Sequence, residues 1–215
     1  MNISKLWRMR RGVISAALLF TLTACGAINK PFNPIDTKRT IKPSSIAVIS
    51  GSYRDADIKM AEFITKGLTE RSVYRVLSQD EIGKRIPAYP FIIAAKERDD
   101  KKDADEKVIW FQPSEKEKLN AMQAKLKVDY LFVIWNSQML QVSSRNGTTY
   151  YVYPVGNMIE YPGAKVVAST RSIDGSSTSI LAMFRSADYY IVDALKGASE
   201  NIVDEFLDVT KSKKP

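Results

Sequence analysis

Residues 129–135, Asp-Tyr-Leu-Phe-Val-Ile-Trp, form the strongest β-strand signal in this chain of 215 residues. All the residues after Asp129 in this run are apolar or aromatic, so the run lacks the polar alternation that marks a half-exposed strand. Such a strand is buried on both sides. We therefore expect a sheet that is covered by helices on one or both faces, which places the chain in the α/β class.

The rest of the chain supplies the helices and strands that such a sheet needs. Apolar residues recur at helical spacing in some segments, and β-branched residues dominate others. The predicted strands lie at 44–50, 73–78 and 129–135, and the predicted helices lie at 56–71, 79–86, 114–127 and 186–211. A capping box of Ser114 and Glu117 is expected to begin the third helix.

After residue 135 the pattern changes to that of antiparallel strands. Arg145-Asn146-Gly147 separates 137–144 from 148–155, and an Asn-Gly between strand-like runs is a strong hairpin signal. Asp174-Gly175 separates 164–173 from 177–185 in the same way. The predicted fold is α/β (α+β): a mixed sheet of about five to seven strands with helices packed on it, C-terminal antiparallel hairpins and a long closing helix.

The first 26 residues carry a signal of a different kind. Residues 1–11 are short and positively charged, and residues 12–24 are apolar or small over a length typical of a signal peptide. Leu22-Thr23-Ala24-Cys25 then resembles the bacterial lipobox. That resemblance implies cleavage before Cys25 and attachment of diacylglycerol and a fatty acid such as palmitate to the new N-terminus. It predicts a signal peptide at 1–24. The prolines and the lack of apolar periodicity in the next segment predict a flexible tether at 25–43, and the helices and strands that follow predict one globular domain at 44–211.

The same resemblance implies a membrane. Enterobacterial lipoproteins that stay in the inner membrane tend to carry aspartate after the cysteine, and here Gly26 follows. We therefore expect a lipid anchor in the outer membrane that faces the periplasm, with the periplasmic face of the inner membrane as the second choice.

The composition excludes several classes of function. The chain has no histidine and one cysteine, so a catalytic site based on histidine, an internal disulfide and a Cys/His zinc site are all excluded. Four of its 32 basic residues lie in the first eleven, which leaves a net charge of +4 for the rest, so no nucleic-acid partner is expected. No phosphate-binding glycine motif occurs, and we expect neither a cofactor nor an enzyme activity.

The charged run 96–107 reads as a solvated loop. Counted from Asp99, it places Ala104 where a calcium-binding EF-hand loop needs glycine and Trp110 where it needs glutamate, so no metal site is expected.

Five aromatic residues are candidates for contact with a partner protein: Tyr150, Tyr151, Tyr153, Trp110 and Phe111. Tyrosine and tryptophan offer a large contact area with a polar handle. The sequence leaves a second role open for each, because tyrosine is also a common strand residue and the Trp110-Phe111 pair could fasten the preceding loop onto the domain. Strand alternation places Tyr150 on one face and Tyr151 and Tyr153 on the other.

A degenerate pattern also resembles a group of bacterial envelope domains. Leu68, Tyr74-Arg75-Val76-Leu77, Asp80-Glu81-Ile82 and Val128-Asp129-Tyr130-Leu131 are similar to positions in the N-terminal domain of TolB, the curli secretion protein CsgG and the lipoprotein activators of penicillin-binding proteins. The resemblance implies a membrane-anchored, non-catalytic lipoprotein that binds or helps to assemble an envelope protein complex. Its oligomeric state stays open.

Two alternatives remain. The first is a subunit of a CsgG-like secretion apparatus. The second is an envelope hydrolase that uses paired carboxylates, for which Asp129 and Asp174 lie at predicted strand ends.

Overall fold

The computed structural model describes residues 33–34, 44–98, 108–144, 147–171, 174–177 and 186–210. The predicted signal peptide, Cys25 and residues 99–107 of the predicted charged loop lie outside the described residues. The elements in chain order are β1 (Asn33–Pro34), β2 (Ser45–Ser50), α2 (Asp55–Arg71), β3 (Arg75–Val76), α3 (Gln79–Arg85), β4 (Ala95–Arg98), β5 (Val108–Phe111), α4 (Pro113–Leu126), β6 (Tyr130–Ser144), β7 (Gly147–Glu160), β8 (Lys165–Arg171), β9 (Asp174–Ser177) and α5 (Ala187–Thr210).

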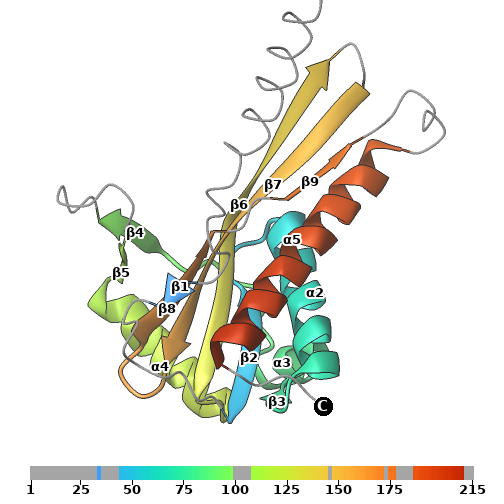
Figure 1. Cartoon of the computed structure of the whole chain (residues 1–215). Helices are drawn as coiled ribbons and strands as arrows, with labels where there is room; N and C mark the ends of the chain where they lie inside the picture. Colours follow the sequence, from blue (N-terminus) through green and yellow to red (C-terminus); the bar gives the residue numbers. More distant parts are fainter. Residues whose placement is uncertain are drawn as a thin grey trace, which may run out of the picture.

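The main sheet has seven strands and is mixed, as the sequence predicts (Figure 1). Its order is β1-β8-β7-β6-β2-β3, and β9 pairs with β7 off this path. β2 runs parallel to β3 and β6, and the other pairs are antiparallel. β4 and β5 form a separate two-stranded sheet. The α/β fold class with its long closing helix is confirmed.

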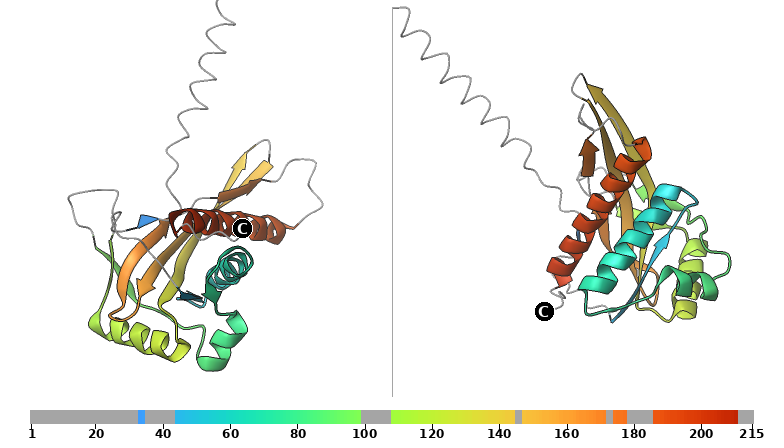
Figure 2. Two further views of the ribbon diagram at one scale, coloured as in Figure 1. Left: turned by 60° about the horizontal axis from the view of Figure 1, so that its bottom comes forward. Right: turned by 90° about the vertical axis from the view of Figure 1, so that its right-hand side faces the viewer.

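Two hydrophobic cores lie on opposite faces of the central strands. Tyr130, Phe132 and Ile134 belong to the core under α2 and α5, whereas Leu131 and Val133 belong to the core under α3 and α4. The two views in Figure 2 show α2 and α5 on one side of the sheet and α4 on the other. Burial on both faces explains why this run is apolar without alternation.

Of the two predicted hairpins, the first is confirmed and the second is wrong. Ser144 pairs with Gly147, so β6 and β7 form the hairpin around Asn146-Gly147, with strands of 15 and 14 residues. Asp174 and Gly175 do not form a turn between neighbouring strands. They belong to β9, which pairs with Thr149–Val152 of β7, while β8 pairs with β7 farther along the same edge. β7 is long enough to carry both short strands in succession.

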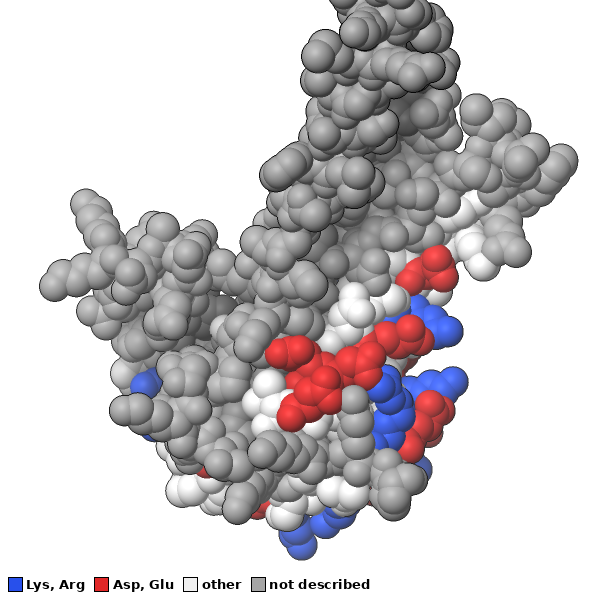
Figure 3. Space-filling model, in the orientation of Figure 1, with Lys and Arg blue, Asp and Glu red and all other residues white. Residues whose placement is uncertain are grey.

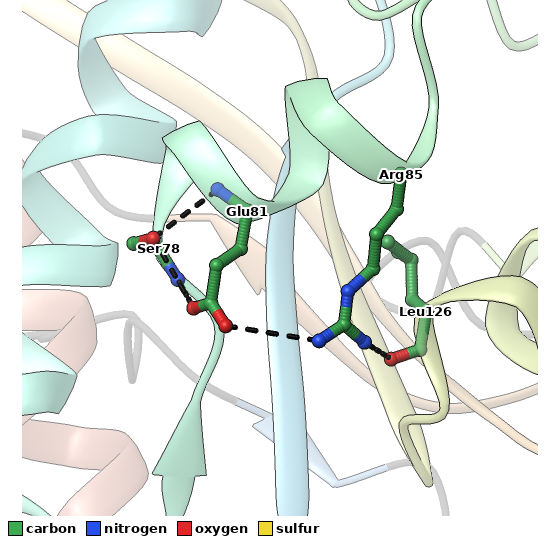
Figure 4. Close-up of polar contacts among 4 residues, drawn as sticks. All are labelled: Ser78, Glu81, Arg85 and Leu126. Carbon is green, nitrogen blue, oxygen red and sulfur yellow. Dashed lines mark hydrogen bonds and ion pairs between the residues drawn. The ribbon is translucent and has the colours of Figure 1, made fainter.

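The capping box lies on a different helix from the predicted one (Figure 4). α4 begins with Pro113 at its first position and has no side-chain cap on Gln112, because proline fixes the helical start one residue before Ser114. The capping box is on α3, where the Ser78 hydroxyl accepts from the Glu81 amide and the Glu81 carboxylate accepts from the Ser78 amide.

The α3 helix is tied to α4 at its other end. Arg85 donates from Nη1 to the Leu126 carbonyl at the C-terminus of α4, at 2.6 Å, and its Nη2 lies 3.7 Å from Glu81 Oε1 (Figure 4). An arginine is well placed there, since the last carbonyls of a helix lack partners of their own.

Three short strands differ from the prediction. The predicted strand 73–78 is reduced to β3, whose two residues pair with the start of β2. Residues 96–98 of the predicted charged loop belong to β4, which pairs through its backbone with β5 and so needs no apolar side chains. β1 lies inside the predicted tether and pairs with β8 at the edge of the main sheet.

Candidate functional site

The long hairpin of β6 and β7 divides into two parts at a bulge. Trp135 pairs with Val155 and Gln138 pairs with Tyr153, so two residues of β6, Asn136 and Ser137, lie opposite the single residue Pro154 of β7. We call residues 130–135 and 155–160 the base of the hairpin, and residues 138–144 and 147–153 the distal hairpin. The distal hairpin extends past the end of β2, whose pairing with β6 stops at Ile134 (Figure 1).

A buried carboxylate of α2 holds the bulge. Asp57 lies in the first turn of α2 and is fully buried. Its Oδ1 accepts from the Ser137 amide at 2.9 Å, and its Oδ2 accepts from the Ser52 hydroxyl. The N-terminal end of a helix favours a negative charge, which explains the tolerance of a carboxylate there. Asp57 therefore fixes the direction in which the distal hairpin leaves the base.

The two strands of the distal hairpin expose apolar side chains and carry no charge. The described residues of β6 and β7 from Tyr130 to Ile159 include no Asp, Glu, Lys or Arg, although charged residues make up 26% of the chain. Met139, Leu140 and Val142 are 53%, 48% and 45% exposed. Exposed apolar residues scattered singly are ordinary, whereas neighbouring ones are candidates for an interaction surface.

The three predicted tyrosines lie on this hairpin and divide between its faces. Tyr150 is half-buried and stacks on Tyr190 of α5, with ring centroids 6.4 Å apart and planes at 11°. Its neighbour Val152 belongs to the core under α5. Tyr151 and Tyr153 therefore point to the opposite face, as alternation predicts, and both are half-buried.

On that opposite face, the tyrosines lie beside the exposed residues of β6. Leu140 pairs with Tyr151, and Gln138 pairs with Tyr153. Residues directly across an antiparallel pair share a face. Tyr151, Tyr153, Leu140 and Val142 thus form one surface, which we call the tyrosine face.

The second predicted pair does not join this surface. Phe111 is 1% exposed and packs edge-to-face on Trp135, with centroids 5.5 Å apart and planes at 75°. This ring fastens β5 to the core under α4, which is the alternative role that the sequence left open, and it is not accessible to a partner. Trp110 lies in β5 opposite Lys96, and its side chain is outside the described part of the structure.

A groove runs beside the start of the distal hairpin. It has a volume of about 710 Å³ and lies between the N-terminus of α2 and β6. Tyr53, Arg54, Asp55 and Ala56 line it on the α2 side, and Ser137, Gln138 and Met139 line it on the β6 side. Its lining is part polar and part apolar, and Tyr53 is 61% exposed.

The remaining polar clusters are occupied by bonds within the protein. Asp129, before β6, accepts through Oδ2 from the Ser44 hydroxyl and from the amide and hydroxyl of Ser45, the last two at 3.0 and 2.9 Å. The hydrogen bond from the Ser44 hydroxyl holds the pKa of Asp129 below its ordinary value; partial burial opposes this effect, and the hydrogen bonds from Ser45 add to the lowering. This clip joins the starts of the parallel strands β2 and β6.

A second cluster lies at the carboxyl end of β2, where α/β proteins often bind ligands. Tyr89 accepts from the Ser50 amide and donates to Gln79 Oε1, both at 2.9 Å. The Gln79 amide group donates to the Val48 carbonyl and to the Thr65 hydroxyl, at 2.9 and 2.7 Å. Burial raises the pKa of the Tyr89 hydroxyl. The network ties the segment after α3 to the sheet.

Asp129 and Asp174 lie far apart in the fold. The carbonyl of Asp129 accepts from the Tyr161 amide, directly after the end of β7, whereas Asp174 pairs with Val152. Val152 and Glu160 are separated along β7 by a length on the order of 25 Å. The two catalytic carboxyl groups of a glycosidase lie within about 10 Å of each other. Asp129 and Asp174 therefore do not converge on one substrate.

The described residues include no group of three or more His, Cys, Asp or Glu side chains arranged to hold a metal ion. In the same part of the chain, no helix has the length and apolarity needed to cross a bilayer.

The charge of α5 contrasts with the neutral hairpin. α5 carries six acidic residues and one lysine: Asp188, Asp193, Glu200, Asp204, Glu205 and Asp208, with Lys196. On the face shown in Figure 3, acidic side chains gather in a band over the closing helix. A partner that docks on the distal hairpin meets a neutral surface, whereas one that approaches α5 meets a negative one.

The fold is similar to that of several bacterial lipoproteins. A minor lipoprotein of Acinetobacter baumannii superposes with a TM-score of 0.44 at 7% identity, over 82% of this chain and 99% of that one. The lipoprotein GNA1162 of Neisseria meningitidis gives 0.41 at 11% identity, over 75% and 99%. PelC of Paraburkholderia phytofirmans, which forms a dodecamer, gives 0.42 at 8% identity, over 81% and 96%.

No protein-family model and no curated protein matches the sequence. The structural similarities concern the course of the chain, and we transfer no residue role, partner or membrane from them.

The sequence offered the tyrosines as candidates but did not predict three further features of the candidate site: the bulge, its partner Asp57 and the exposed side of β6. One signal was present. The apolar run ends at Trp135 and the polar residues Asn136, Ser137 and Gln138 follow, which is where a bulge between two parts of a strand can occur. Asp57 gave no signal, because an acidic residue in the first turn of a helix is common.

Proposed function

We propose that this protein is a non-catalytic lipoprotein of the bacterial envelope that assembles with protein partners through its distal hairpin. One observation carries the proposal: the hairpin projects past the parallel part of the sheet and exposes Met139, Leu140 and Val142 on a strand without charges. Protein interfaces have centres depleted in charge and enriched in tyrosine and methionine. The tyrosine face offers Tyr151, Tyr153, Leu140 and Val142 without a charge, and Met139 is exposed on the other face of the same strand.

The lipobox at Leu22–Cys25 supports the membrane attachment. A single acyl chain binds a membrane only marginally, and each further chain adds about 0.8 kcal/mol per buried methylene. Three chains on one N-terminus hold a protein permanently. The anchor would concentrate the hairpin near envelope partners on the periplasmic side of the outer membrane.

Replacement of Cys25 tests the anchor. The Cys25→Ala variant, expressed in a Gram-negative host, should lose metabolic labelling with palmitate and leave the membrane fraction or accumulate as the precursor. Mass spectrometry of the wild-type protein should find a lipid on Cys25 as the first residue. A mature protein that retains residues 1–24 without lipid would contradict the proposal.

Replacement of the tyrosines tests the working surface. The lipidated Tyr151→Ala/Tyr153→Ala variant should keep its far-UV circular dichroism and melting temperature within a few degrees, because both rings are half-buried. It should lose its place in envelope complexes separated by native electrophoresis.

Tyr161→Ala is the matched control. Tyr161 is 43% exposed and lies at the other end of β7, away from the distal hairpin. Its replacement should leave the complexes unchanged. If the double variant unfolds, the two rings belong to the core. If it folds and still enters the complexes, the tyrosine face is not the docking surface.

A further inference from the structure

The edges of the main sheet differ in how well they are protected. β1 and β3 are two residues long, and β1 contains Pro34. β9 is four residues long and contains Asp174 and Gly175. Short strands, proline and inward charges are the usual protection of an edge. The edge of β6 beyond Ile134 is longer, because none of the described strands pairs with residues 138–144 on the side opposite β7.

The backbone of this edge points its bonding groups outward at alternate residues. The Ser137 amide donates to Asp57 of α2, on the side away from β7. In an antiparallel strand the bonding direction alternates from one residue to the next. Gln138, Leu140 and Val142 therefore bond to β7, while Met139, Gln141 and Ser143 direct their N–H and C=O groups to the open edge.

The side chains of this edge also leave it unprotected. Residues 138–144 read Gln-Met-Leu-Gln-Val-Ser-Ser, with no charge and no proline. The groove between α2 and residues 137–139 leaves space beside the start of the edge. An exposed, uncharged edge strand is a template for the addition of another strand.

We propose that the occupant of this edge is a second copy of the chain, paired antiparallel through its own residues 138–144 with Gln141 on the two-fold axis. This inference rests on the proposed function and names the first partner of the distal hairpin. With Gln141 opposite Gln141, all seven residues of each edge pair and the bulge stays outside. The outward-pointing Met139, Gln141 and Ser143 then meet Ser143, Gln141 and Met139 of the second copy.

The side chains fit this register. Leu140 lies opposite the second copy's Val142, and Val142 lies opposite its Leu140, so four apolar side chains gather around the axis on the tyrosine face. Tyr151 pairs with Leu140 from the other side and extends this apolar row in each copy. Because the edge is uncharged, the symmetric pairing brings no like charges together. A two-fold interface also closes on itself and yields a dimer rather than a fibre.

Disulfide trapping in the envelope tests the register. In the full-length protein expressed in a Gram-negative host, Gln141→Cys should form a disulfide-linked dimer on a non-reducing gel, since paired Cα atoms in a sheet lie about 5.5 Å apart. Gln138→Cys is the matched control, because two copies of residue 138 would lie on the order of 20 Å apart in this register. Its dimer band should be at least tenfold weaker. The unmodified chain shows any contribution of Cys25.

A charge on the edge should reduce the pairing. Val142→Lys in the Gln141→Cys background should lower the trapped dimer at least tenfold, whereas Val73→Lys, at a site 61% exposed on another element, should not. Equal trapping at positions 138 and 141, or no dimer at 141, overturns the proposal. A product of Gln141→Cys with another protein also overturns it, since a different strand then fills the edge.

The two proposals fail in different ways. If the Tyr151→Ala/Tyr153→Ala variant loses the native complexes and Gln141→Cys traps no dimer, the proposed docking surface stands and the proposed pairing with a second copy is wrong. If Gln141→Cys traps the dimer and the complexes survive the loss of both tyrosines, the proposed dimer stands and the tyrosine face is not the site for other partners.

Discussion

The base and the distal part of β6 belong to one strand, yet they meet different surroundings. From Tyr130 to Trp135 every side chain is buried, because α2 and α5 cover one face and α4 covers the other. From Gln138 to Ser143 every side chain is exposed. Both parts are rich in apolar residues. An apolar strand therefore indicates that its side chains will be buried. It does not indicate whether the surface that buries them belongs to the same chain.

The largest change in stability is expected when a large side chain is removed from the base, and the same kind of change in the distal hairpin is the comparison. Phe132→Ala at the base should lower the free energy of unfolding by about 3–5 kcal/mol, since Phe132 is 2% exposed and its removal leaves a cavity. Leu140→Ala should cost about 0.5 kcal/mol or less in dilute solution, where association contributes little. Urea unfolding followed by circular dichroism measures both. Similar losses would show that the distal hairpin is packed against the body.

Asp57 holds the bulge that links the base to the distal hairpin, and its replacement should weaken this link. Asp57→Ala should cost about 2–3 kcal/mol, because it leaves the Ser137 amide buried without its partner. Amide hydrogen exchange in residues 138–144 should become faster, since the direction of the hairpin is no longer fixed. Asp55→Ala, in the same helical turn but exposed, is the control. Equal effects of the two variants would remove Asp57 as the holder of the bulge.

A smaller effect is expected from a polar residue buried at the base. Asn157 lies within β7 with an exposed fraction of 0%, and neither its Oδ1 nor its Nδ2 has a hydrogen-bond partner in the structure. Asn157→Leu keeps the number and branching of the side-chain heavy atoms and should raise the free energy of unfolding by about 1–2 kcal/mol, since an unsatisfied buried amide is costly. Gln138→Leu on the exposed hairpin should give no such gain. A loss of stability at position 157 would indicate that the amide has a function.

The smallest expected effect is a pH dependence at the start of the base. The folded state lowers the pKa of Asp129, so the stabilisation is complete above the ordinary value near 3.8 and is lost as the pH falls through the lower folded value. Asp129→Asn should cost about 1 kcal/mol at pH 7, because solvent screens this half-exposed site. The difference from the wild type should vanish at strongly acidic pH.

The Ser44→Ala variant tests whether the Ser44 hydroxyl causes this pH dependence. Ser44→Ala removes the hydroxyl that contributes most to the shift. It should reduce the pH dependence in the wild-type background and have no further effect on it in the Asp129→Asn background. Urea unfolding at a series of pH values measures both. An unchanged slope in Ser44→Ala would contradict the assignment to that hydroxyl.

Local signals predicted much of the fold because they depend on residues near one another in sequence. The helices 56–71, 79–86 and 186–211 were placed within two residues of their observed bounds. The Asn146-Gly147 hairpin was also predicted, since the turn needs only its own residues. Asp174-Gly175 has the same local signature, but the hairpin predicted there is wrong, because residues 174–177 pair with the long edge of β7.

The candidate site was predictable only in part. Tyr150, Tyr151 and Tyr153 could be assigned to faces from alternation alone. The free edge of β6 could not be predicted, because it depends on where β2 ends relative to β6, and β2 lies about 80 residues earlier in the chain. Phe111 had two possible roles in the sequence, and only its contact with Trp135 decided between them.

The sequence by itself determined the α/β class, the predicted lipid anchor at Cys25 and the exclusion of histidine chemistry, because each follows from composition or from a short motif. The tertiary structure decided which half of an apolar strand is covered and which is left open. The physical reason is that burial is a property of pairs of surfaces. β6 is apolar along most of its length, but α2, α4 and α5 bury the side chains of its base alone, and the remainder keeps an edge that another chain can complete.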